Sequence, residues 1–308
     1  MNDLVRQLGA RLTAAGSGNA KRAVEELAAH VLGCKPLEIY FKTITPEQRA
    51  ELEKLIVRAE QGEPIQYIIG HVDFRGLEIS CDRRALIPRP ETELLVQAVL
   101  DTVEAASCRW AQRQDAASTL KIVDVGTGTG CIALALLAEL PNAEVVAVDI
   151  SPDALALANE NAERLGLAGR FTAVQGNLLN VDAVSSPRFP CFKRGEDTAS
   201  TFFAEASLDI VVSNPPYIFS EVWETLDPAV RDFEPKLALD GGADGLDLVR
   251  PLVEQAVRVL KPGGGLFLEI GYDQGQAVAR ILKDAGFQQV EIKKDLAGLD
   301  RIVLGFRA

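Results

Sequence analysis

The sequence is poor in the residues that build metal sites and disulfide frameworks. Its 308 residues include two histidines and five cysteines, and no two cysteines stand in a C-x-x-C spacing. The cysteines are odd in number and scattered along the chain: Cys34, Cys81, Cys108, Cys131 and Cys191. This pattern supports neither a zinc site nor a set of disulfides, so we expect no bound metal and a reducing, cytoplasmic compartment.

Long hydrophobic runs and an excess of positive charge are also missing. The longest apolar stretch, residues 131–138, is far shorter than the roughly 20 residues that cross a bilayer, and the first residues lack the apolar region of a signal peptide. The net charge is -12 and the pI about 4.8, whereas proteins that contact nucleic-acid phosphates usually present a basic face. We expect no membrane association, no direct nucleic-acid partner, and a protein or small-molecule substrate.

Hydrophobic residues, at 47% of the chain, are enough for a globular core, and the length suggests about two domains. Residues 1–62 predict a small all-helical bundle, because apolar residues recur at helical spacing. The third helix has a clear start: Thr45 is the N-cap, Pro46 is the first helical residue, and Gln48 completes a capping box. This bundle has no evident catalytic groups. A packing role and a role in docking the substrate are both open, and substrate docking is our working prediction.

Residues 63–92 predict a β-hairpin linker between the domains. Residues 67–70 and 77–80 look like two strands around a turn at Arg75 and Gly76. A helix is expected to start at Thr92 and run to Val103, followed by a loop over residues 105–118.

Two charged residues in this linker, Arg89 and Glu91, are flanked by prolines that keep the backbone extended. A surface ion pair would explain them, and so would a contact with a substrate. Both interpretations stay open from the residues alone.

Residues 93–308 predict the second domain, in which apolar strands alternate with helical stretches. This alternation is typical of a doubly wound, mainly parallel sheet. The expected strands are 120–125, 144–148, 171–175, 208–212 and 265–270, with a final pair at 290–292 and 302–304. The stretch 181–206 has no periodicity and is expected to be a surface insertion.

Three glycines at every second position follow the first of these strands. Gly126, Gly128 and Gly130 would let a ligand approach the backbone, and the next helix presents free N–H groups. The dinucleotide fingerprint requires glycine or alanine where this chain has Cys131, so the spacing argues against a pyrophosphate site.

Two polar residues follow the next strands of the predicted sheet. Asp149 ends the second strand about twenty residues after the glycines, where a carboxylate can accept both hydroxyls of a ribose. Asn177 ends the third strand and would lie near an adenine edge. A ribose and an adenine without a pyrophosphate indicate S-adenosylmethionine.

A rigid turn follows the strand predicted over residues 208–212. Pro215 and Pro216 remove two backbone donors and restrict φ, and they keep Asn214 out of the helical region. The turn offers bare carbonyls, one side-chain amide and the ring of Tyr217, without an ionisable base. At the carboxyl end of a strand it suits a planar, uncharged amide or amine, although a proline-rich loop stop would have the same residues.

These motifs resemble those of known methyltransferases. Residues 124–130 resemble motif I of class I S-adenosylmethionine-dependent methyltransferases. Residues 214–217 resemble the (Asp/Asn)-Pro-Pro-(Tyr/Phe) motif of the members that methylate planar nitrogens. Further stretches are similar to the HemK/PrmC family: 62–68, 86–93, 230–242 and 295–301. The resemblance covers essentially the whole chain, and the segments near 105–118 and 181–206 are longer than the family pattern.

The resemblance implies a Rossmann-like class I methyltransferase sheet, α/β in class, with a small all-α N-terminal domain. It implies transfer of a methyl group from S-adenosylmethionine to N5 of the glutamine in the Gly-Gly-Gln motif of peptide chain release factors, with S-adenosylhomocysteine as product. The expected cofactor contacts are Gly126, Thr127, Gly128, Thr129, Gly130, Asp149, Asn177, Leu178 and Asn214. The expected substrate contacts are Arg89, Glu91, Asn214, Pro215, Pro216 and Tyr217, of which Asn214, Pro215 and Tyr217 are expected to be catalytic.

We expect the Asn214 oxygen and the Pro215 carbonyl to accept the two N–H bonds of a glutamine amide, with Tyr217 packed against it. Two other functions share part of the pattern. A nucleic-acid exocyclic amino-methyltransferase would need a basic groove, which is not apparent, and a non-catalytic S-adenosylmethionine-binding scaffold would tolerate a change at Asn214.

Overall fold

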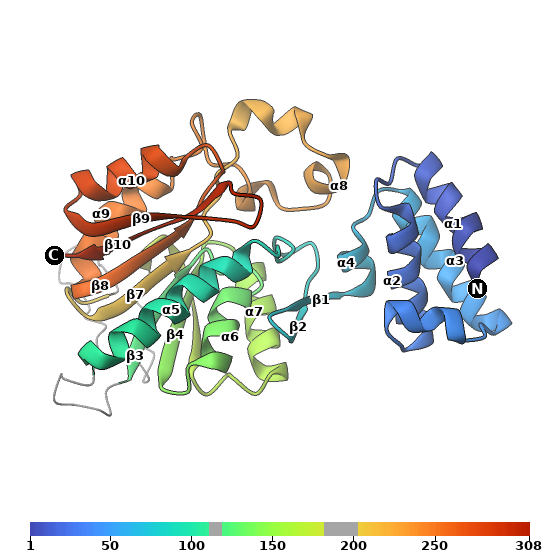
Figure 1. Ribbon diagram of the computed structural model, residues 1–308, viewed down its shortest axis with the longest axis horizontal. Coiled ribbons are helices and arrows are strands. Elements are labelled where there is room, and N and C mark those ends of the chain that lie inside the picture. Colours follow the sequence, from blue (N-terminus) through green and yellow to red (C-terminus); the bar gives the residue numbers. More distant parts are fainter. Residues whose placement is uncertain (111–118, 182–202) are drawn as a thin grey trace.

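The computed structural model describes residues 1–110, 119–181 and 203–308. Three parts follow one another along the chain: a helical unit, a short β-hairpin, and a large sheet covered by helices (Figure 1). The N-terminus lies in the helical unit and the C-terminus at the opposite end of the long axis of the molecule.

The helical unit buries one apolar stripe from each helix in a common core. Its helical segments are α1 (Asn2–Ala14), α2 (Ala20–Leu32), the 3₁₀ helix η1 (Pro36–Phe41) and α3 (Pro46–Glu60). Leu8, Leu27 and Leu52 are completely buried there. The predicted capping box is confirmed, because Thr45 Oγ1 accepts from Gln48 N at 3.3 Å and Gln48 Oε1 accepts from Thr45 N at 3.0 Å.

The strand predicted over residues 67–70 is wrong, because a short helix, α4 (Ile65–Ile69), occupies this position. Its apolar residues serve two different cores, which is why they do not alternate with polar ones. Ile68 packs into the helical unit. Tyr67 points the other way, and its hydroxyl donates to the carbonyl of Ala85 at 2.7 Å.

The hairpin that follows consists of β1 (His71–Phe74) and β2 (Leu77–Ser80), paired antiparallel. Its turn lies at the predicted place: Arg75 and Gly76 both have positive φ, 51° and 74°.

Helix α5 (Thr92–Trp110) starts at the predicted residue but runs beyond Val103. The loop predicted over 105–118 is therefore wrong for residues 105–110, and its remainder lies outside the described residues. The alanines at 105 and 106 favour helix.

The sheet has eight strands in the order β6-β5-β4-β3-β7-β8-β10-β9. The strands are β3 (Leu120–Val125), β4 (Ala143–Asp149), β5 (Phe171–Asn177), β6 (Asn180–Val181), β7 (Leu208–Ser213), β8 (Leu260–Glu269), β9 (Phe287–Lys294) and β10 (Asp300–Arg307). From β5 to β8 neighbouring strands are parallel, and β6, β9 and β10 add antiparallel pairs at the two edges.

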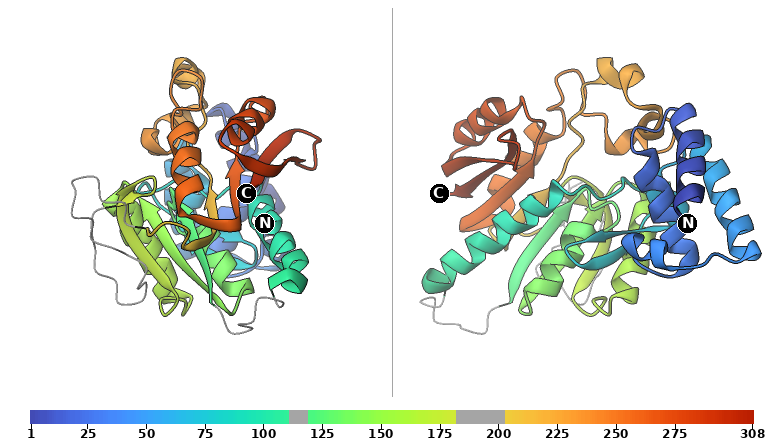
Figure 2. Two further views of the ribbon diagram at one scale, coloured as in Figure 1. Left: turned by 90° about the vertical axis from the view of Figure 1, so that its left-hand side faces the viewer. Right: turned by 45° about the vertical axis from the view of Figure 1, so that its right-hand side comes forward.

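Helices cover both faces of this sheet (Figure 2). α5, α6 (Cys131–Glu139) and α7 (Pro152–Arg164) pack on one face, and α9 (Val249–Val259) and α10 (Gly275–Asp284) pack on the other. Successive residues of β3 serve opposite faces, since Ile122 belongs to the first core and Val123 to the second. Both residues are apolar because each face is buried, which gives the continuous apolar strand seen in the sequence.

Between β7 and α9 the chain forms an arch above the sheet, with η2 (Ser220–Thr225), α8 (Pro228–Arg231) and η3 (Lys236–Ala238) (Figure 1). The insertion predicted over 181–206 lies mostly outside the described residues. Across 1–110, 119–181 and 203–308, no helix is long and apolar enough to span a membrane, and no cluster of three metal-ligating side chains occurs.

Candidate active site

The strand order places a topological switch point between β3 and β7. From β3 the chain adds β4 and β5 on one side, then returns to β7 and β8 on the other. Loops that leave neighbouring strands at such a point diverge and leave a crevice at the carboxyl edge of the sheet. The glycine loop follows β3 and the Asn-Pro-Pro-Tyr turn follows β7, so the two predicted motifs meet at this edge.

Each of the three loop glycines has a left-handed backbone. The φ values of Gly126, Gly128 and Gly130 are 71°, 55° and 82°, a region in which an L side chain is strained. Gly126 N donates to the carbonyl of Val148 at 2.8 Å, which ties the loop to β4. A Cβ on Gly126 would meet no protein atom within 4 Å, so this side of the loop is open to a ligand.

The two threonines of the loop face the protein interior. Thr127 and Thr129 are only 3% and 1% exposed. Thr127 Oγ1 donates to Asp124 Oδ2 at 2.7 Å. Burial raises the pKa of Asp124 to about 7, and the hydrogen bond from Thr127 opposes this rise. The Thr127 side chain therefore stabilises the loop from the interior side.

Asp149, at the end of β4, is fixed by backbone groups. Its Oδ2 accepts from Gly128 N and its Oδ1 from Ser151 N, both at 2.9 Å. Burial raises the pKa of Asp149, and these two hydrogen bonds oppose the rise. A carboxylate has about four lone-pair positions, so Asp149 keeps acceptor capacity for a ligand.

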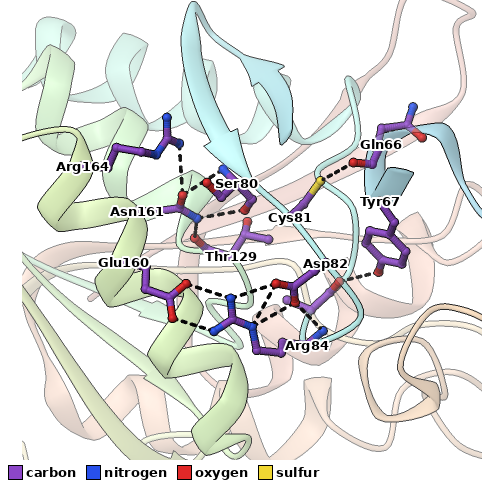
Figure 3. Close-up of polar contacts among 11 residues, drawn as sticks. Gln66, Tyr67, Ser80, Cys81, Asp82, Arg84, Thr129, Glu160, Asn161 and Arg164 are labelled. Atoms are coloured by element: carbon purple, nitrogen blue, oxygen red, sulfur yellow. Dashed lines mark hydrogen bonds and ion pairs between the residues drawn. The ribbon is translucent and has the colours of Figure 1, made fainter. Parts of the chain in front are cut away.

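Asn161 on α7 joins the hairpin to the glycine loop (Figure 3). Its side chain is completely buried. Oδ1 accepts from Ser80 N at 2.8 Å, while Nδ2 donates to the carbonyls of Ser80 and Thr129 at 3.0 and 2.9 Å. The end of β2 is therefore held directly against the loop that follows β3.

Arg84 extends this connection along the linker (Figure 3). Its guanidinium lies between two carboxylates, 2.8 Å from Asp82 and 2.7 Å from Glu160 on α7. The next residues, Ala85 and Leu86, reach the carboxyl edge of the sheet. The linker thus contributes one wall of the site.

A cavity of about 190 Å³ lies at this edge. Eight of the residues that the sequence assigned to cofactor or substrate line it: Gly126, Gly128, Asp149, Asn177, Leu178, Asn214, Pro215 and Pro216. Six others lie outside its lining: Thr127, Thr129, Gly130, Tyr217, Arg89 and Glu91.

The cavity also has walls that sequence reasoning missed. These lining residues include Arg84, Ala85, Leu86, Pro235, Leu237, Ala238 and Leu248. Most of them are apolar and carry no chemical signature in the sequence. The only signal was the family resemblance of residues 86–93 and 230–242.

Two distant glycines hold the Asn-Pro-Pro-Tyr turn in place. A Cβ on Gly241 would lie 2.7 Å from the carbonyl oxygen of Pro216, and one on Gly245 would lie 2.4 Å from that of Tyr217. No side chain fits at such distances, so the turn packs on bare backbone. Gln274 Nε2 adds a hydrogen bond of 3.1 Å to the Tyr217 carbonyl.

The side chain of Asn214 is held by buried polar groups. Its Nδ2 donates to Thr92 Oγ1 at 3.2 Å, and Thr92, the first residue of α5, is 2% exposed. The carboxyl of Glu269, at the end of β8, is 1% exposed and lies beside both. Burial raises the pKa of Glu269 to about 7, while hydrogen bonds from Thr92 and Asn214 and the charge of Arg301 oppose the rise. Sequence reasoning did not select Thr92 or Glu269.

Arg89 forms an ion pair across the linker. Its guanidinium lies 2.5 Å from Glu234 Oε1, and the Glu234 side chain is 1% exposed. The second oxygen of Glu234 accepts from Ile87 N at 3.1 Å. This pair fastens the linker to the arch. Glu91 is exposed, and its charge acts on the neighbouring Tyr217 and Glu269.

Two family descriptions match the chain: "PrmC N-terminal domain" over residues 3–70 and "Methyltransferase domain" over residues 116–294. Curated relatives named release factor glutamine methyltransferase match over most of their length. The protein from Caulobacter vibrioides is 38% identical over 93% of this chain and 88% of its own. The one from Deinococcus radiodurans is 37% identical over 100% of this chain and 99% of its own.

The chain belongs to the release factor glutamine methyltransferase family. The relative from Moorella thermoacetica, 41% identical over 86% of this chain and 82% of its own, agrees with this assignment. The family predicted from the motifs is therefore confirmed.

The predicted fold class is confirmed as well. The crystal structure of the hMettl16 catalytic domain in complex with MAT2A 3'UTR hairpin 6 matches with a TM-score of 0.53, covering 85% of this chain and 82% of that chain. The identity is 13%, so this likeness concerns the fold alone. Together with the methyltransferase-domain match and the strand order, it places the large domain among Rossmann-like methyltransferases.

Proposed function

We propose that the protein transfers a methyl group from S-adenosylmethionine to the side-chain amide nitrogen, N5, of the glutamine in the Gly-Gly-Gln motif of peptide chain release factors. One observation carries the proposal: Asn214 and Asp149 line the same cavity, so the turn suited to a planar nitrogen and the carboxylate suited to a ribose face one space. The relatives' shared name supports this substrate. We expect the reaction to occur in the cytoplasm.

The residues of the cavity fit S-adenosylmethionine. The open side of Gly126 allows close approach to the backbone, and Asp149 has acceptor capacity left for the ribose hydroxyls. Asn177 and Leu178, at the end of β5, would contact the adenine. When bound, the cofactor supplies an electrophilic methyl group on a sulfonium sulfur.

The Asn-Pro-Pro-Tyr turn would bind and aim the substrate amide. The Asn214 side-chain oxygen and the Pro215 carbonyl accept the two N–H bonds of the glutamine amide, so its nitrogen is directed at the methyl group. Well-oriented reactants can gain roughly 7–11 kcal/mol of the barrier. The same two acceptors stabilise the positive charge that builds up on nitrogen.

Tyr217 would pack against the planar amide and exclude water. Burial raises the pKa of Tyr217 to about 12, so its phenol stays neutral and does not act as a base at physiological pH. No base is needed before methyl transfer. The carbon–nitrogen bond forms as the carbon–sulfur bond breaks, sulfur keeps the electron pair, and the methylated amide then loses one proton to water.

We also propose that the helical unit, residues 1–62, docks the substrate protein. One of the two family descriptions that match this chain covers the helical unit. The helical unit itself has no evident catalytic groups. The hairpin linker over residues 63–92 would then connect it to the methyltransferase domain, residues 93–308.

The test uses the full chain, S-adenosylmethionine and an intact release factor, with methylation mapped by mass spectrometry of the digested factor. We expect one methyl group on the glutamine of the Gly-Gly-Gln motif and none when that glutamine is replaced by glutamate. The Asn214→Ala variant should lose about 10²–10³ in kcat, as for removal of one preorganised hydrogen-bonding group. Bulk DNA and RNA are offered in separate reactions, and incorporation into nucleic acid alone would contradict the proposal.

A further inference from the structure

Tyr67 carries a buried phenol that the proposed function does not use. It lies on α4 and is 6% exposed, packed with Cys81 and Ile87 of the linker. Its hydroxyl donates to the carbonyl of Ala85 at 2.7 Å, and both groups are buried (Figure 3). One side chain therefore joins α4 to the stretch of linker that forms a wall of the candidate site.

The carbonyl of Ala85 depends on this bond. Among the hydrogen bonds of the described residues, none but that of Tyr67 ends on this oxygen. The N–H of Ala85 donates back to the carbonyl of Asp82 at 3.2 Å, so the short turn over residues 82–85 ends at the group that Tyr67 holds. Buried carbonyls are almost always paired, and here the pairing comes from another element of the fold.

The methyl group of Ala85 faces the glycine loop. A Cβ on Gly128 would lie 3.7 Å from it, and Ala85 also packs with Ala154 and Leu157 of α7. Ala85, Gly128 and Ala154 all line the cavity of the candidate site. The position of the Ala85 backbone therefore sets the distance between the linker wall and the glycine loop.

Loss of the phenol hydroxyl would release this wall toward the cavity. A buried carbonyl without a donor is costly, so the peptide unit that follows Ala85 would turn to reach water. The open space beside that unit is the cavity, which Ala85 and Leu86 both line. A carbonyl turned in this direction would occupy space that the bound cofactor needs.

We propose that Tyr67 is a positioning residue for the cofactor: its hydroxyl holds Ala85, and with it the linker wall, at the distance from the glycine loop that binds S-adenosylmethionine. This inference rests on the function proposed above, in which the cofactor occupies the cavity. Tyr67 does not line the cavity itself, so it acts through Ala85. A phenol that only stabilised the fold would leave the affinity for the cofactor unchanged.

The first test uses Tyr67→Phe in the full chain, because this change keeps the ring and removes only the hydroxyl. We expect the affinity for S-adenosylmethionine to fall about tenfold in calorimetry, the size of effect that an unpaired buried acceptor produces. The KM for S-adenosylmethionine should rise by the same factor, while kcat at saturating cofactor and the KM for the release factor stay at wild-type values. Such a split separates a cofactor-positioning role from a general loss of structure.

Tyr40→Phe is the matched control. The Tyr40 hydroxyl donates to a carboxylate oxygen of Glu25 inside the helical unit, and neither residue lines the cavity. The melting temperature should fall in both phenylalanine variants, whereas the affinity for S-adenosylmethionine should fall in Tyr67→Phe alone. Wild-type affinity in Tyr67→Phe, or an equal loss of affinity in the two variants, would overturn the proposal.

A second measurement needs neither cofactor nor activity. Hydrogen exchange of the ligand-free protein, followed by mass spectrometry, reports on the backbone amides of residues 82–87. We expect these amides to exchange at least about tenfold faster in Tyr67→Phe through local opening, with unchanged rates in β3 and β4 and in the linker of Tyr40→Phe. Unchanged exchange over residues 82–87, or faster exchange across the whole domain, would overturn the proposal. If the wild type methylates no release factor but Tyr67→Phe binds the cofactor more weakly and frees these amides, the proposed function fails and the positioning role of Tyr67 stands.

Discussion

Ser213 Oγ donates a hydrogen bond of 2.7 Å to the carbonyl oxygen of Val125, and this bond joins the ends of β7 and β3. The two residues are 1% and 3% exposed. Asn214 follows the first and Gly126 follows the second. The bond therefore fixes the separation of the two loops that form the candidate site. This role does not require the Ser213 side chain to contact a ligand.

Replacing Ser213 by alanine should weaken both the fold and the reaction. The buried carbonyl of Val125 loses a partner, which costs about 1–3 kcal/mol of unfolding free energy, and kcat should fall because the two loops can separate. Urea unfolding and initial rates measure the two effects. Ser207→Ala removes a similar bond in a turn, to Ala204 at 2.7 Å, and should leave kcat unchanged. A Ser213→Ala variant that is as stable as the wild type but inactive would contradict this prediction, because loss of the bond should lower both stability and kcat.

Asp149→Ala should weaken cofactor binding and leave the fold intact. Removal of a charged acceptor costs about 1.5–3 kcal/mol, so we expect S-adenosylmethionine affinity to fall roughly 10- to 100-fold in calorimetry. Circular dichroism checks the fold. Asp153→Ala, an exposed carboxylate on the same loop-to-helix junction, is the matched control and should bind like the wild type. Equal affinity in the two variants would remove Asp149 from the cofactor site.

Gly241→Ala should disturb the Asn-Pro-Pro-Tyr turn. A Cβ there would lie 2.7 Å from the Pro216 carbonyl oxygen and 2.8 Å from Tyr217 Cα, and such overpacking costs about 1–3 kcal/mol. We expect a lower melting temperature and a lower kcat. Gly169→Ala introduces the same methyl where no atom lies within 4 Å and should change neither. A fully active Gly241→Ala variant would mean that the turn tolerates displacement.

Arg89 and Glu91 should separate into a structural and a surface role. Arg89→Ala leaves the buried Glu234 carboxylate without its cation, and since the Arg89 side chain is 34% exposed, we expect destabilisation below the roughly 3–5 kcal/mol of a fully buried pair. Glu91→Ala removes an exposed charge and should change stability by less than about 0.5 kcal/mol. If Glu91 contacts the release factor, its variant raises KM at wild-type stability. Chemical unfolding and steady-state kinetics on both variants distinguish these roles.

Glu269 should make stability depend on pH. Burial raises its pKa from 4.5 to about 7 in the folded protein, so the folded state binds more protons than the unfolded state between these values. The contribution of Glu269 is fully present below about pH 4.5 and is lost as the pH rises through about 7. The unfolding free energy of Glu269→Gln should therefore rise relative to wild type across this window in urea titrations. A constant difference would contradict the raised pKa, and Asp124, which titrates near 7 as well, cancels in the comparison.

The sequence predicted most of the fold because its signals were local. The capping box at Thr45, the left-handed glycines after β3 and the continuous apolar strands each reflect physics within a few residues. The wrong strand over residues 67–70 arose where distant contacts decided the outcome. Tyr67 and Ile68 form a helix because they pack into two different cores, and no local pattern encodes that division.

The sequence by itself determined which chemistry the chain carries: the glycine loop, Asp149 and the Asn-Pro-Pro-Tyr turn are short motifs whose function lies in their residue types. Only the tertiary structure decided how they meet. The switch point between β3 and β7 puts Asn214 and Asp149 on one cavity, and Glu269 comes beside Thr92 and Asn214 through strand pairing and helix packing. Contacts between residues so far apart in the chain are set by burial and sheet order, which appear only when the whole core is assembled.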